Sequence, residues 1–356
     1  MCHLSFFVSL WQENALFKQT KEMTSTNIVL TGKQQIELLT EPVGLLPEDG
    51  LLAKTRLSML STGTECICYR GELEEGSHWA GWVKYPFYPG YSNVGVVEQV
   101  GPAVEGFQVG DRIFCTSHHQ QYHIVRPPAR KIPDEVGDES AVWTKLATIA
   151  QTAVRRARLE LGAKVAVIGL GPVGQLIVQY CRLMGAEEVL AIDLIESRLR
   201  AAAAHGATQI FVGGAAEALP FVRDHTNGRL ADVVFEVTGH PAVFPLALKL
   251  TRNFGTMMLV GDCPQPGKQV LAVDIITRGV EVRGAHNEKL PPNEAEEWGK
   301  VRQTELFYKY ISRGEMKVDD LITSRHSPCE APEVYARLAQ DRADSIGVAF
   351  DWSRLS

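Results

Sequence analysis

Hydrophobic residues follow two different patterns along this chain, and the change between them divides it. From about residue 27 to residue 125, apolar positions come in short runs that end at turns such as Gly101-Pro102. The clearest runs cover residues 35–39, 51–60, 94–100, 113–115 and 122–125. Short strands separated by turns predict an all-β, barrel-like opening domain.

From residue 139 onward, apolar runs alternate with stretches of helical period. The expected strands cover residues 164–168, 187–193, 209–212, 232–237, 256–260 and 280–284, and the expected helices cover 139–158, 173–184, 197–205 and 242–250. Strands that alternate with helices predict an α/β fold with a doubly wound parallel sheet. Such a sheet binds its ligand at the carboxyl ends of its strands, which here means near Gly169, Asp193, Thr238 and Gly261.

The two ends of the chain complete this division. Helices are expected around residues 293–313 and 331–340, and a last strand over 346–350 is expected to return to the first domain. We therefore assign residues 23–150 and 286–356 to a β-rich domain, and 151–285 to a nucleotide-binding domain. Residues 1–22 are expected to be a disordered extension, because the strand-like pattern begins only after Met23.

The segment 169–174 reads Gly-Leu-Gly-Pro-Val-Gly and stands between a buried strand and an amphipathic helix. In dinucleotide-binding folds the first glycine permits a tight turn, the second lets the backbone approach a pyrophosphate, and the third lets helix and strand pack closely. The start of the helix adds free N–H groups and a positive dipole end. In a glycine-rich chain this motif alone could be only a turn, but here the flanking strands and the helix are also in place.

Asp193 ends the second strand, 19 residues after Gly174 (193 − 174), close to the position of a ribose-binding acid. Its carboxylate could accept from both ribose hydroxyls and would repel a 2′-phosphate, which favours NAD over NADP. Arg198 is expected over the adenine or the ribose. The residues expected to contact the cofactor are Gly169, Gly171, Pro172, Val173, Gly174, Asp193, Arg198, Thr238, Gly239, Val260 and Gly261.

Composition narrows the possible partners. The 356 residues are 45% hydrophobic and 22% charged, which is ordinary for a globular protein of about two domains. A net charge of −6 argues against nucleic acid or a membrane surface as a partner, and no apolar run is long enough to span a bilayer. Seven scattered cysteines favour reduced thiols in the cytoplasm. We expect a small-molecule substrate.

Several motifs carry a resemblance to a known family. They are Ser-Thr-Gly-Thr-Glu at 61–65, Pro-Gly-Tyr-Ser-Asn-Val-Gly-Val-Val at 89–97, Val-Gly-Asp-Arg at 109–112, the glycine segment, and Leu-Ile-Thr at 321–323. With them, the chain from residue 27 onward resembles the medium-chain dehydrogenase/reductase superfamily of zinc-type alcohol dehydrogenases, which join a GroES-like domain to a Rossmann domain. The 61–65 segment is similar to the branch of 2-desacetyl-2-hydroxyethyl bacteriochlorophyllide dehydrogenases. The resemblance implies oxidation of a secondary alcohol, and a homodimer through edge strands near 276–282.

The chain departs from this family where zinc members hold their metal. By resemblance, Thr62, Tyr91, Ser92 and Thr144 stand where those members have zinc ligands or acids. The four-cysteine lobe that follows Gly-Asp-Arg in zinc members is missing here. Neutral hydroxyls hold Zn²⁺ poorly, because the metal prefers thiolate, imidazole or carboxylate. We therefore expect no metal site.

Without a metal, hydrogen-bonding side chains must move the proton and stabilise the oxyanion. Thr64 matches the hydroxyl that relays the proton in zinc members, Tyr91 replaces a ligand, and His119 lies in a segment expected beside the cleft. These three are the candidate catalytic residues. Alternatively, Thr64 could bond local backbone, Tyr91 could serve packing, and His119 could be solvated. Glu65 could orient its neighbours or be a surface charge, and the pattern slightly favours the surface.

The sequence predicts an NAD-dependent oxidoreductase that transfers a hydride between nicotinamide and a secondary alcohol or ketone without catalytic zinc. One alternative is a quinone or enone reductase of the same superfamily. Those relatives commonly prefer NADPH, which Asp193 disfavours. The other alternative is a dinucleotide-binding protein without turnover.

Overall fold

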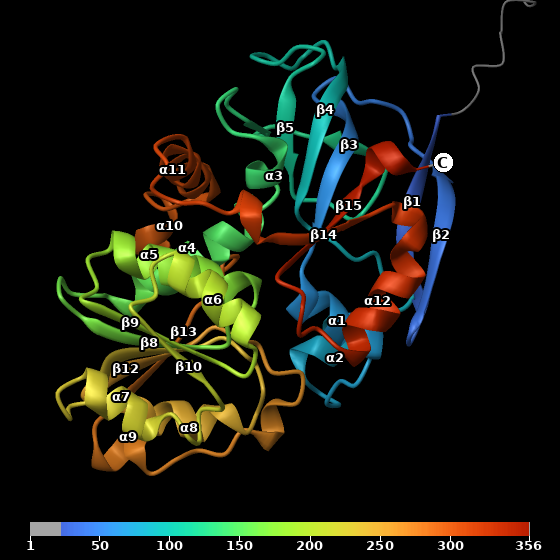
Figure 1. Cartoon of the computed structure of the whole chain (residues 1–356). Helices are drawn as coiled ribbons and strands as arrows, with labels where there is room; N and C mark the ends of the chain where they lie inside the picture. Colours follow the sequence, from blue (N-terminus) through green and yellow to red (C-terminus); the bar gives the residue numbers. More distant parts are fainter. Residues whose placement is uncertain (1–22, 356) are drawn as a thin grey trace, which may run out of the picture.

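The computed structural model of the chain describes residues 23–355 and contains two main β-sheets (Figure 1). One sheet is built mainly from the beginning and the end of the described chain, and the other from its middle. The expected N-terminal extension, residues 1–22, lies outside the described residues. Together the two sheets form an α/β fold with a GroES-like domain and a parallel-sheet Rossmann domain.

The first sheet has the strand order β14-β15-β3-β4-β5-β7, with β6 pairing to β3. Its strands are β3 (Leu51–Leu60), β4 (Asn93–Val100), β5 (Arg112–Cys115), β6 (Tyr122–Val125), β7 (Arg130–Lys131), β14 (Ile322–His326) and β15 (Gly347–Asp351). A separate antiparallel hairpin consists of β1 (Thr24–Gly32) and β2 (Gln35–Pro42). Most residues of β3 are buried because this strand pairs with three neighbours.

Two helices interrupt this region, so the prediction of an all-β opening domain is wrong. They are α1 (Thr62–Arg70) and α2 (His78–Trp82). Helix α1 ends at Gly71, whose left-handed φ of 61° lets its N–H bond to the carbonyl of Ile67 at 3.0 Å. Its first turn contains Thr62-Gly63-Thr64, residues of low helix propensity. Packing against α12 (Ala331–Gln340) decides the conformation instead.

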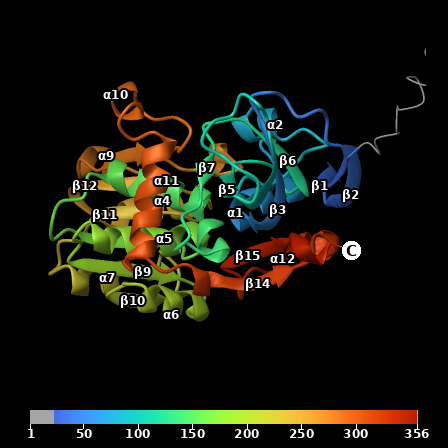
Figure 2. The same cartoon turned by 90° about the horizontal axis from the view of Figure 1, so that it is seen from above.

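The last strand returns to the first sheet, as expected. Strand β15 pairs antiparallel with β3 and parallel with β14. Figure 2 shows β14, β15 and α12 lying with the N-terminal strands and not with the helices of the parallel sheet. A buried cluster that includes Leu60, Cys66, Tyr335 and Phe350 joins these distant segments.

The second sheet is parallel, with the order β10-β9-β8-β11-β12-β13. Its strands are β8 (Lys164–Ile168), β9 (Glu188–Asp193), β10 (Gln209–Val212), β11 (Ala231–Glu236), β12 (Thr251–Leu259) and β13 (Glu281–Gly284). Both faces are covered, so alternate residues of β8 face different helices. Val165 and Val167 belong to the core under α4 (Thr144–Ala157) and α5 (Pro172–Leu183), and Ala166 and Ile168 to the core under α8 (Val243–Leu250).

Among the remaining helices, those at 196–204 and 300–312 were predicted with slightly different ends, whereas those at 219–225 and 274–277 were not predicted. These remaining helices are α3 (Asp138–Ala141), α6 (Glu196–Ala204), α7 (Leu219–His225), α9 (Asp274–Thr277), α10 (Pro292–Ala295) and α11 (Lys300–Ser312). The single helix expected over 139–158 is two helices, α3 and α4, that meet at Val142 and Trp143. Both joining residues are fully buried. Within residues 23–355, no helix has the length and apolar character needed to cross a bilayer.

Candidate cofactor and active site

The strand order of the parallel sheet reverses between β8 and β11, and the glycine segment lies at this point. Gly169 has a φ of 94°, and a Cβ added there would lie 2.8 Å from Cγ2 of Thr238. A Cβ at Gly174 would lie only 2.0 Å from the carbonyl oxygen of Gly169. These two glycines are therefore required for the turn and for the close packing of α5 on β8.

Gly171 is different, because a Cβ there would meet no atom within 4 Å. The backbone at this point faces open space. Gly171 is the N-cap of α5, and no side chain caps the helix. The first backbone N–H groups of α5 can therefore donate to a bound anion, except at Pro172, which has no N–H. This arrangement fits the pyrophosphate of a dinucleotide.

Asp193 ends β9 beside the glycine segment and is 9% exposed. Its Oδ2 accepts from the N–H of Leu170 at 2.6 Å, and its Oδ1 accepts from the N–H of Ile195 at 2.9 Å. These bonds fix the carboxylate at the switch point of the sheet, the crevice at the carboxyl ends of β8, β9, β11 and β12 where sheets of this kind bind their ligands. Each oxygen keeps a lone pair with which to accept from a hydroxyl group.

Arg198 has a role that the sequence did not indicate. Its Nη2 donates to the carbonyl oxygen of Ser345 at 3.0 Å and also to that of Arg342. The side chain of Arg342 in turn donates to the carbonyl oxygen of Thr62 at 3.1 Å. Arg198 thus connects the parallel sheet to the segment before β15, and its guanidinium is committed to that contact. The expected position of Arg198 over the adenine or ribose stays a prediction.

The turns after β11 and β12 lie beside the glycine segment at the carboxyl ends of the strands. Oε1 of Glu236 accepts from the N–H groups of Thr238 at 2.7 Å and Gly239 at 3.2 Å. Glu236 is fully buried, and burial raises the pKa of its carboxyl group. A Cβ at Gly261 would lie 2.1 Å from the nitrogen of Gly239, so the two turns touch. Residues 169, 193, 238 and 261 therefore lie along one edge of the sheet.

Two of the three candidate catalytic residues lie together. The hydroxyl of Tyr91 is 3.4 Å from Oγ1 of Thr64, and both side chains are partly exposed. Burial, and secondly the carboxylate of Glu65, raises the pKa of Tyr91. The phenol therefore stays protonated at neutral pH and can donate a hydrogen bond.

The third candidate, His119, lies in the core. Its Nδ1 is 2.8 Å from Oγ of Ser58, and its Nε2 is 3.0 Å from Oε2 of Glu65. Tyr335 also donates to this carboxylate, and the N–H of Ser61 donates to its other oxygen at 2.7 Å. His119 is 0% exposed, so it has no surface to offer a bound substrate. His119 is connected to Thr64 through Glu65, the next residue in the sequence.

The same contacts correct the preferred interpretation of Glu65. This side chain is 1% exposed and is not a surface charge. Tyr335, its partner on α12, is 270 residues away in the sequence, so no local pattern could reveal the contact. A buried carboxylate is tolerated because several donors surround it.

The residues that replace zinc ligands are engaged within the chain. Oγ of Ser92 donates to the carbonyl oxygen of Val142 at 2.6 Å. Oγ1 of Thr144 lies 2.6 Å from the carbonyl oxygen of Ala141 and 3.1 Å from the hydroxyl of Tyr308. Across residues 23–355, no three His, Cys, Asp or Glu side chains are grouped so that they could hold a metal ion. The donors present at these positions therefore do not fit a zinc ion.

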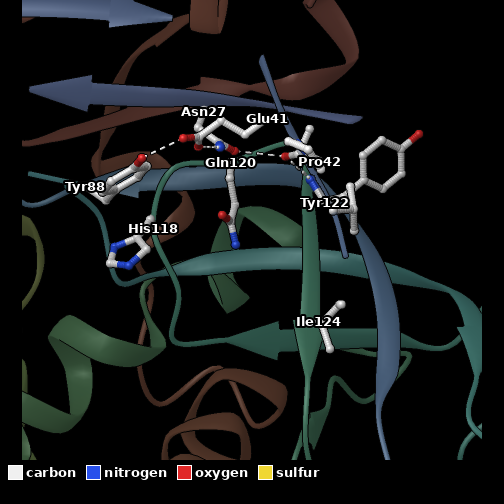
Figure 3. A pocket seen from close by; sticks show the side chains of 10 residues that line it. Asn27, Glu41, Pro42, Tyr88, His118, Gln120, Tyr122 and Ile124 are labelled. Carbon is white, nitrogen blue, oxygen red and sulfur yellow. Dashed lines mark hydrogen bonds between the residues drawn. The ribbon is translucent and has the colours of Figure 1, made fainter. Parts of the chain in front are cut away.

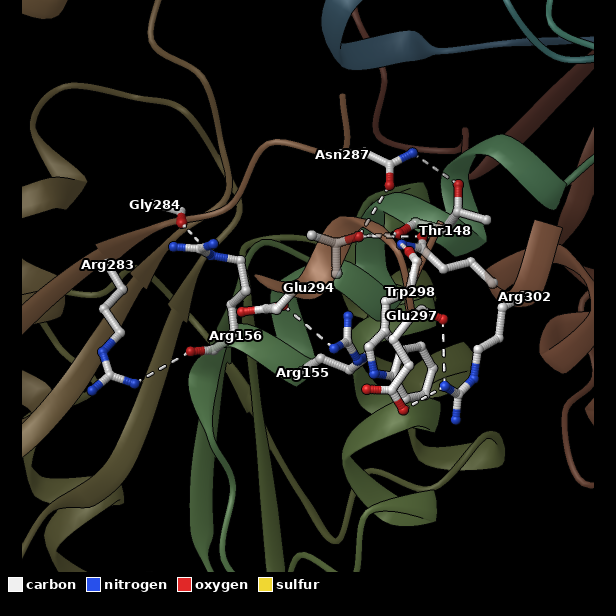
Figure 4. A network of polar contacts seen from close by, with 12 residues as sticks. Thr148, Arg155, Arg156, Arg283, Gly284, Asn287, Glu294, Glu297, Trp298 and Arg302 are labelled. Carbon is white, nitrogen blue, oxygen red and sulfur yellow. Dashed lines mark hydrogen bonds and ion pairs between the residues drawn. The ribbon is translucent and has the colours of Figure 1, made fainter. Parts of the chain in front are cut away.

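Sequence reasoning missed a polar cluster that follows the carboxyl end of β13. Asn287 donates from Nδ2 to Oγ1 of Thr148 at 3.0 Å and accepts from the hydroxyl of Thr152 at 3.0 Å (Figure 4). Lys145, 9% exposed on the first turn of α4, pairs with Glu288. Because β13 ends on the same edge as the other strands, this cluster lies at the carboxyl edge of the parallel sheet. The spacing of Lys145 and Thr148 on one helix was the only signal in the sequence.

An aromatic residue holds this segment in place. The ring of Trp298 lies between two guanidinium groups, 3.7 Å from that of Arg155 and 3.9 Å from that of Arg302 (Figure 4). Arg155 is also paired with Glu294 at 3.4 Å. Stacked guanidinium groups of this kind stabilise a loop through both charge and packing. The segment after β13 is therefore anchored to α4.

A separate pocket of about 640 Å³ lies between the β1–β2 hairpin and residues 118–124 (Figure 3). Glu41 accepts there from the hydroxyl of Tyr88 at 2.7 Å and from the side-chain amide of Asn27. None of the predicted catalytic or cofactor residues lines this pocket. It is distinct from the crevice.

Comparison with known proteins gives the family. Residues 62–151 match the alcohol dehydrogenase GroES-like domain, and residues 172–301 match the zinc-binding dehydrogenase family. The chain belongs to the medium-chain dehydrogenase/reductase superfamily. It is an oxidoreductase of that superfamily with a dinucleotide-binding domain.

Three similar proteins each cover at least 90% of this chain. Sorbitol dehydrogenase of Bacillus subtilis is 25% identical over 90% of this chain and 95% of its own. Two solved structures share the fold: a zinc-binding dehydrogenase of Sinorhizobium meliloti bound to NADP (TM-score 0.76, 21% identity) and an alcohol dehydrogenase of Escherichia coli complexed with NADH (TM-score 0.76, 19% identity). Each match covers 92% of this chain and 99% of the other.

Proposed function

We propose that the protein transfers a hydride between NAD(H) and a secondary alcohol or its ketone without a catalytic zinc ion. The observation that carries this proposal is the crevice itself, where an uncapped helix start, an open glycine backbone and a fixed carboxylate lie along one edge of the parallel sheet. The division into residues 23–150 and 286–356 for catalysis, and 151–285 for the cofactor, belongs to the same proposal.

The fixed position of Asp193 supports NAD over NADP. Hydrogen bonds from Leu170 and Ile195 hold its carboxylate beside the glycine segment. Ribose hydroxyls could donate to the remaining lone pairs, whereas a 2′-phosphate would face a negative charge at short range. The guanidinium nearest to it, that of Arg198, is 4.0 Å away and already donates to carbonyl groups of the segment before β15.

Thr64 and Tyr91 supply the proton chemistry in this proposal. Bound NAD would supply the nicotinamide ring as acceptor for the hydride of the carbinol carbon. The alcohol must also lose a proton, which passes to the hydroxyl of Thr64 as that group gives up its own proton toward solvent. Tyr91 stays protonated and donates to the substrate oxygen as negative charge develops there. In the reverse direction Thr64 gives its proton to the reduced ketone oxygen and regains one from solvent, while Tyr91 again donates a hydrogen bond to that oxygen.

The absence of zinc is supported by donor chemistry. The positions of Thr62, Tyr91, Ser92 and Thr144 offer hydroxyl groups, and two of these already bond to carbonyl oxygens of the chain. Hydroxyl groups without thiolate, imidazole or carboxylate do not hold Zn²⁺ against water.

An assay of the full chain tests this function. We expect NADH to form when the protein is mixed with NAD and a panel of secondary alcohols, and NADH to be consumed with the matching ketones. Turnover only of quinones or enones would favour the reductase alternative. Binding of NAD without turnover of any compound in the panel would favour the non-catalytic alternative.

We also propose a homodimer through β13, the edge strand of the parallel sheet. Apolar side chains are exposed at this edge, with Ile276 at 85%, Val282 at 39% and Phe254 at 80%. Light scattering should give a mass near twice 39.3 kDa, and Ile276→Glu should shift it toward one chain. A monomeric native protein would contradict this assembly.

A further inference from the structure

A second pocket opens at the amino ends of β11 and β12, on the edge of the parallel sheet opposite to the crevice. Its volume is about 640 Å³, within the usual range for small-molecule sites. Five cationic side chains line it: Arg223, Arg229, Lys249, Arg252 and Arg278. This concentration of positive charge occurs in a chain whose net charge is −6.

The acids around the pocket neutralise only part of this charge. Asp232 pairs with Arg252 at 2.5 Å, and Asp274 pairs with Arg278 at 2.8 Å. Among the residues described, the other three cations (Arg223, Arg229 and Lys249) have no carboxylate within 4.0 Å and no side-chain hydrogen bond. Three positive charges therefore repel one another across one pocket, at a cost that a bound anion would remove.

The backbone of the pocket wall is held in an unusual conformation. Three of the four residues from 227 to 230 have left-handed φ values: 53° at Asn227, 78° at Gly228 and 72° at Leu230. For Leu230, a non-glycine residue, this conformation is energetically unfavourable. The hydroxyl of buried Thr226 accepts from the N–H of Leu230 at 2.9 Å and holds the loop in this form. Strain of this kind is often found at ligand clamps.

We propose that this pocket binds a small molecule that carries two or more phosphate charges. Guanidinium groups favour such a ligand because their planar donors match phosphate oxygens in pairs. The site is separate from the crevice. Strand β11 runs from Ala231 at the pocket to Glu236 at the crevice, a span of about 17 Å. The ligand is therefore a second molecule and not the proposed cofactor.

Binding to the full chain tests the site directly. Isothermal titration with inorganic pyrophosphate, and with fructose 1,6-bisphosphate as an organic bisphosphate, should show saturable binding of at least one of them at 0.1 M salt. The double variant Arg223→Gln/Arg229→Gln should weaken this binding at least tenfold. Tighter binding of pyrophosphate would indicate a free polyphosphate as ligand, and tighter binding of the sugar bisphosphate a phosphorylated metabolite.

A matched control separates a site from a general charge effect. Lys309→Gln/Arg313→Gln removes two exposed cations from α11 and its C-terminal end, without touching the pocket, and should leave the affinity unchanged. Equal loss in both double variants, full binding in Arg223→Gln/Arg229→Gln, or no binding of either compound would overturn the proposal. Full binding in the pocket variant would mean that the anion binds elsewhere on the chain. NADH titration and thermal melting of the same variants show that they are folded, and keep this result independent of the proposed function.

Discussion

His119 and Glu65 form a buried pair in which Nε2 of the imidazole lies 3.0 Å from Oε2 of the carboxylate. We expect Glu65→Ala to lower the free energy of unfolding by about 3–5 kcal/mol, because a buried charge network loses one partner. Tyr335→Phe removes one donor and should cost about 1–2 kcal/mol. Urea unfolding measures both. A Glu65→Ala variant with wild-type stability would show that the pair is not part of the folded core.

Cofactor preference should depend on Asp193. We expect NADH to bind at least about tenfold more tightly than NADPH, equivalent to about 1.4 kcal/mol. Asp193→Ser removes the negative charge and should erode this preference. Fluorescence titration of the native protein and of Asp193→Ser with both cofactors measures it. Equal affinities in the native protein would count against NAD.

Proton transfer should depend on the hydroxyl of Thr64. Thr64→Val should reduce kcat about a hundredfold, the usual scale of a lost acid–base or oxyanion contact, and leave NADH affinity unchanged. Thr64→Ser keeps the hydroxyl and should retain most of the activity. Steady-state kinetics compares the two variants. A Thr64→Val variant with normal kcat would remove this residue from the reaction.

Metal content should be low. We expect elemental analysis of the purified protein to give well under one zinc per chain, and chelation to leave activity unchanged, because the available donors are hydroxyl groups. One tightly held zinc ion whose removal abolishes turnover would place the protein with its metal-dependent relatives.

Stability should fall in acid because of His123. This side chain is 1% exposed, its Nδ1 accepts from the amide of Gln120 at 2.8 Å, and burial lowers its pKa to about 3. In the unfolded chain His123 binds a proton as the pH falls below about 6.5, whereas in the folded chain it stays neutral down to about pH 3. Stability is therefore lost as the pH falls from about 6.5 toward 3. Replacing His123 by Gln should remove about 2 kcal/mol of the loss between pH 6.5 and 5. Urea unfolding of the native protein and the variant at both pH values tests this. A variant that loses as much stability between pH 6.5 and 5 as the native protein would contradict it.

The sequence was most informative where structure follows from neighbouring residues. Strands β8 and β9, helix α5 and the turn between them lie where the pattern of residues 164–193 predicted them. Each apolar run is continuous, and Gly169 and Gly174 are required by contacts within the motif itself. Local periodicity and glycine spacing were sufficient there.

The remaining features depend on contacts between distant segments. Helix α1 has weak intrinsic propensity and forms against α12, which lies at the other end of the chain. Arg198 bonds to the carbonyl of Ser345, 147 residues away, so its direction could not be read from the pattern around Asp193. Lys145 meets Glu288 across 143 residues. Tertiary packing decides all three, and a single sequence does not display it.

The position of β15 determines the order in which the two sheets can form during synthesis of the chain. Strand β15 lies between β14 and β3, so the first sheet has a gap beside β3 until residue 351 has left the ribosome. The parallel sheet, in contrast, is complete once residue 284 has emerged. The parallel sheet can therefore fold before strand β3 has its C-terminal partner, β15. During that interval the unpaired edge of β3 is open to aggregation and to chaperones.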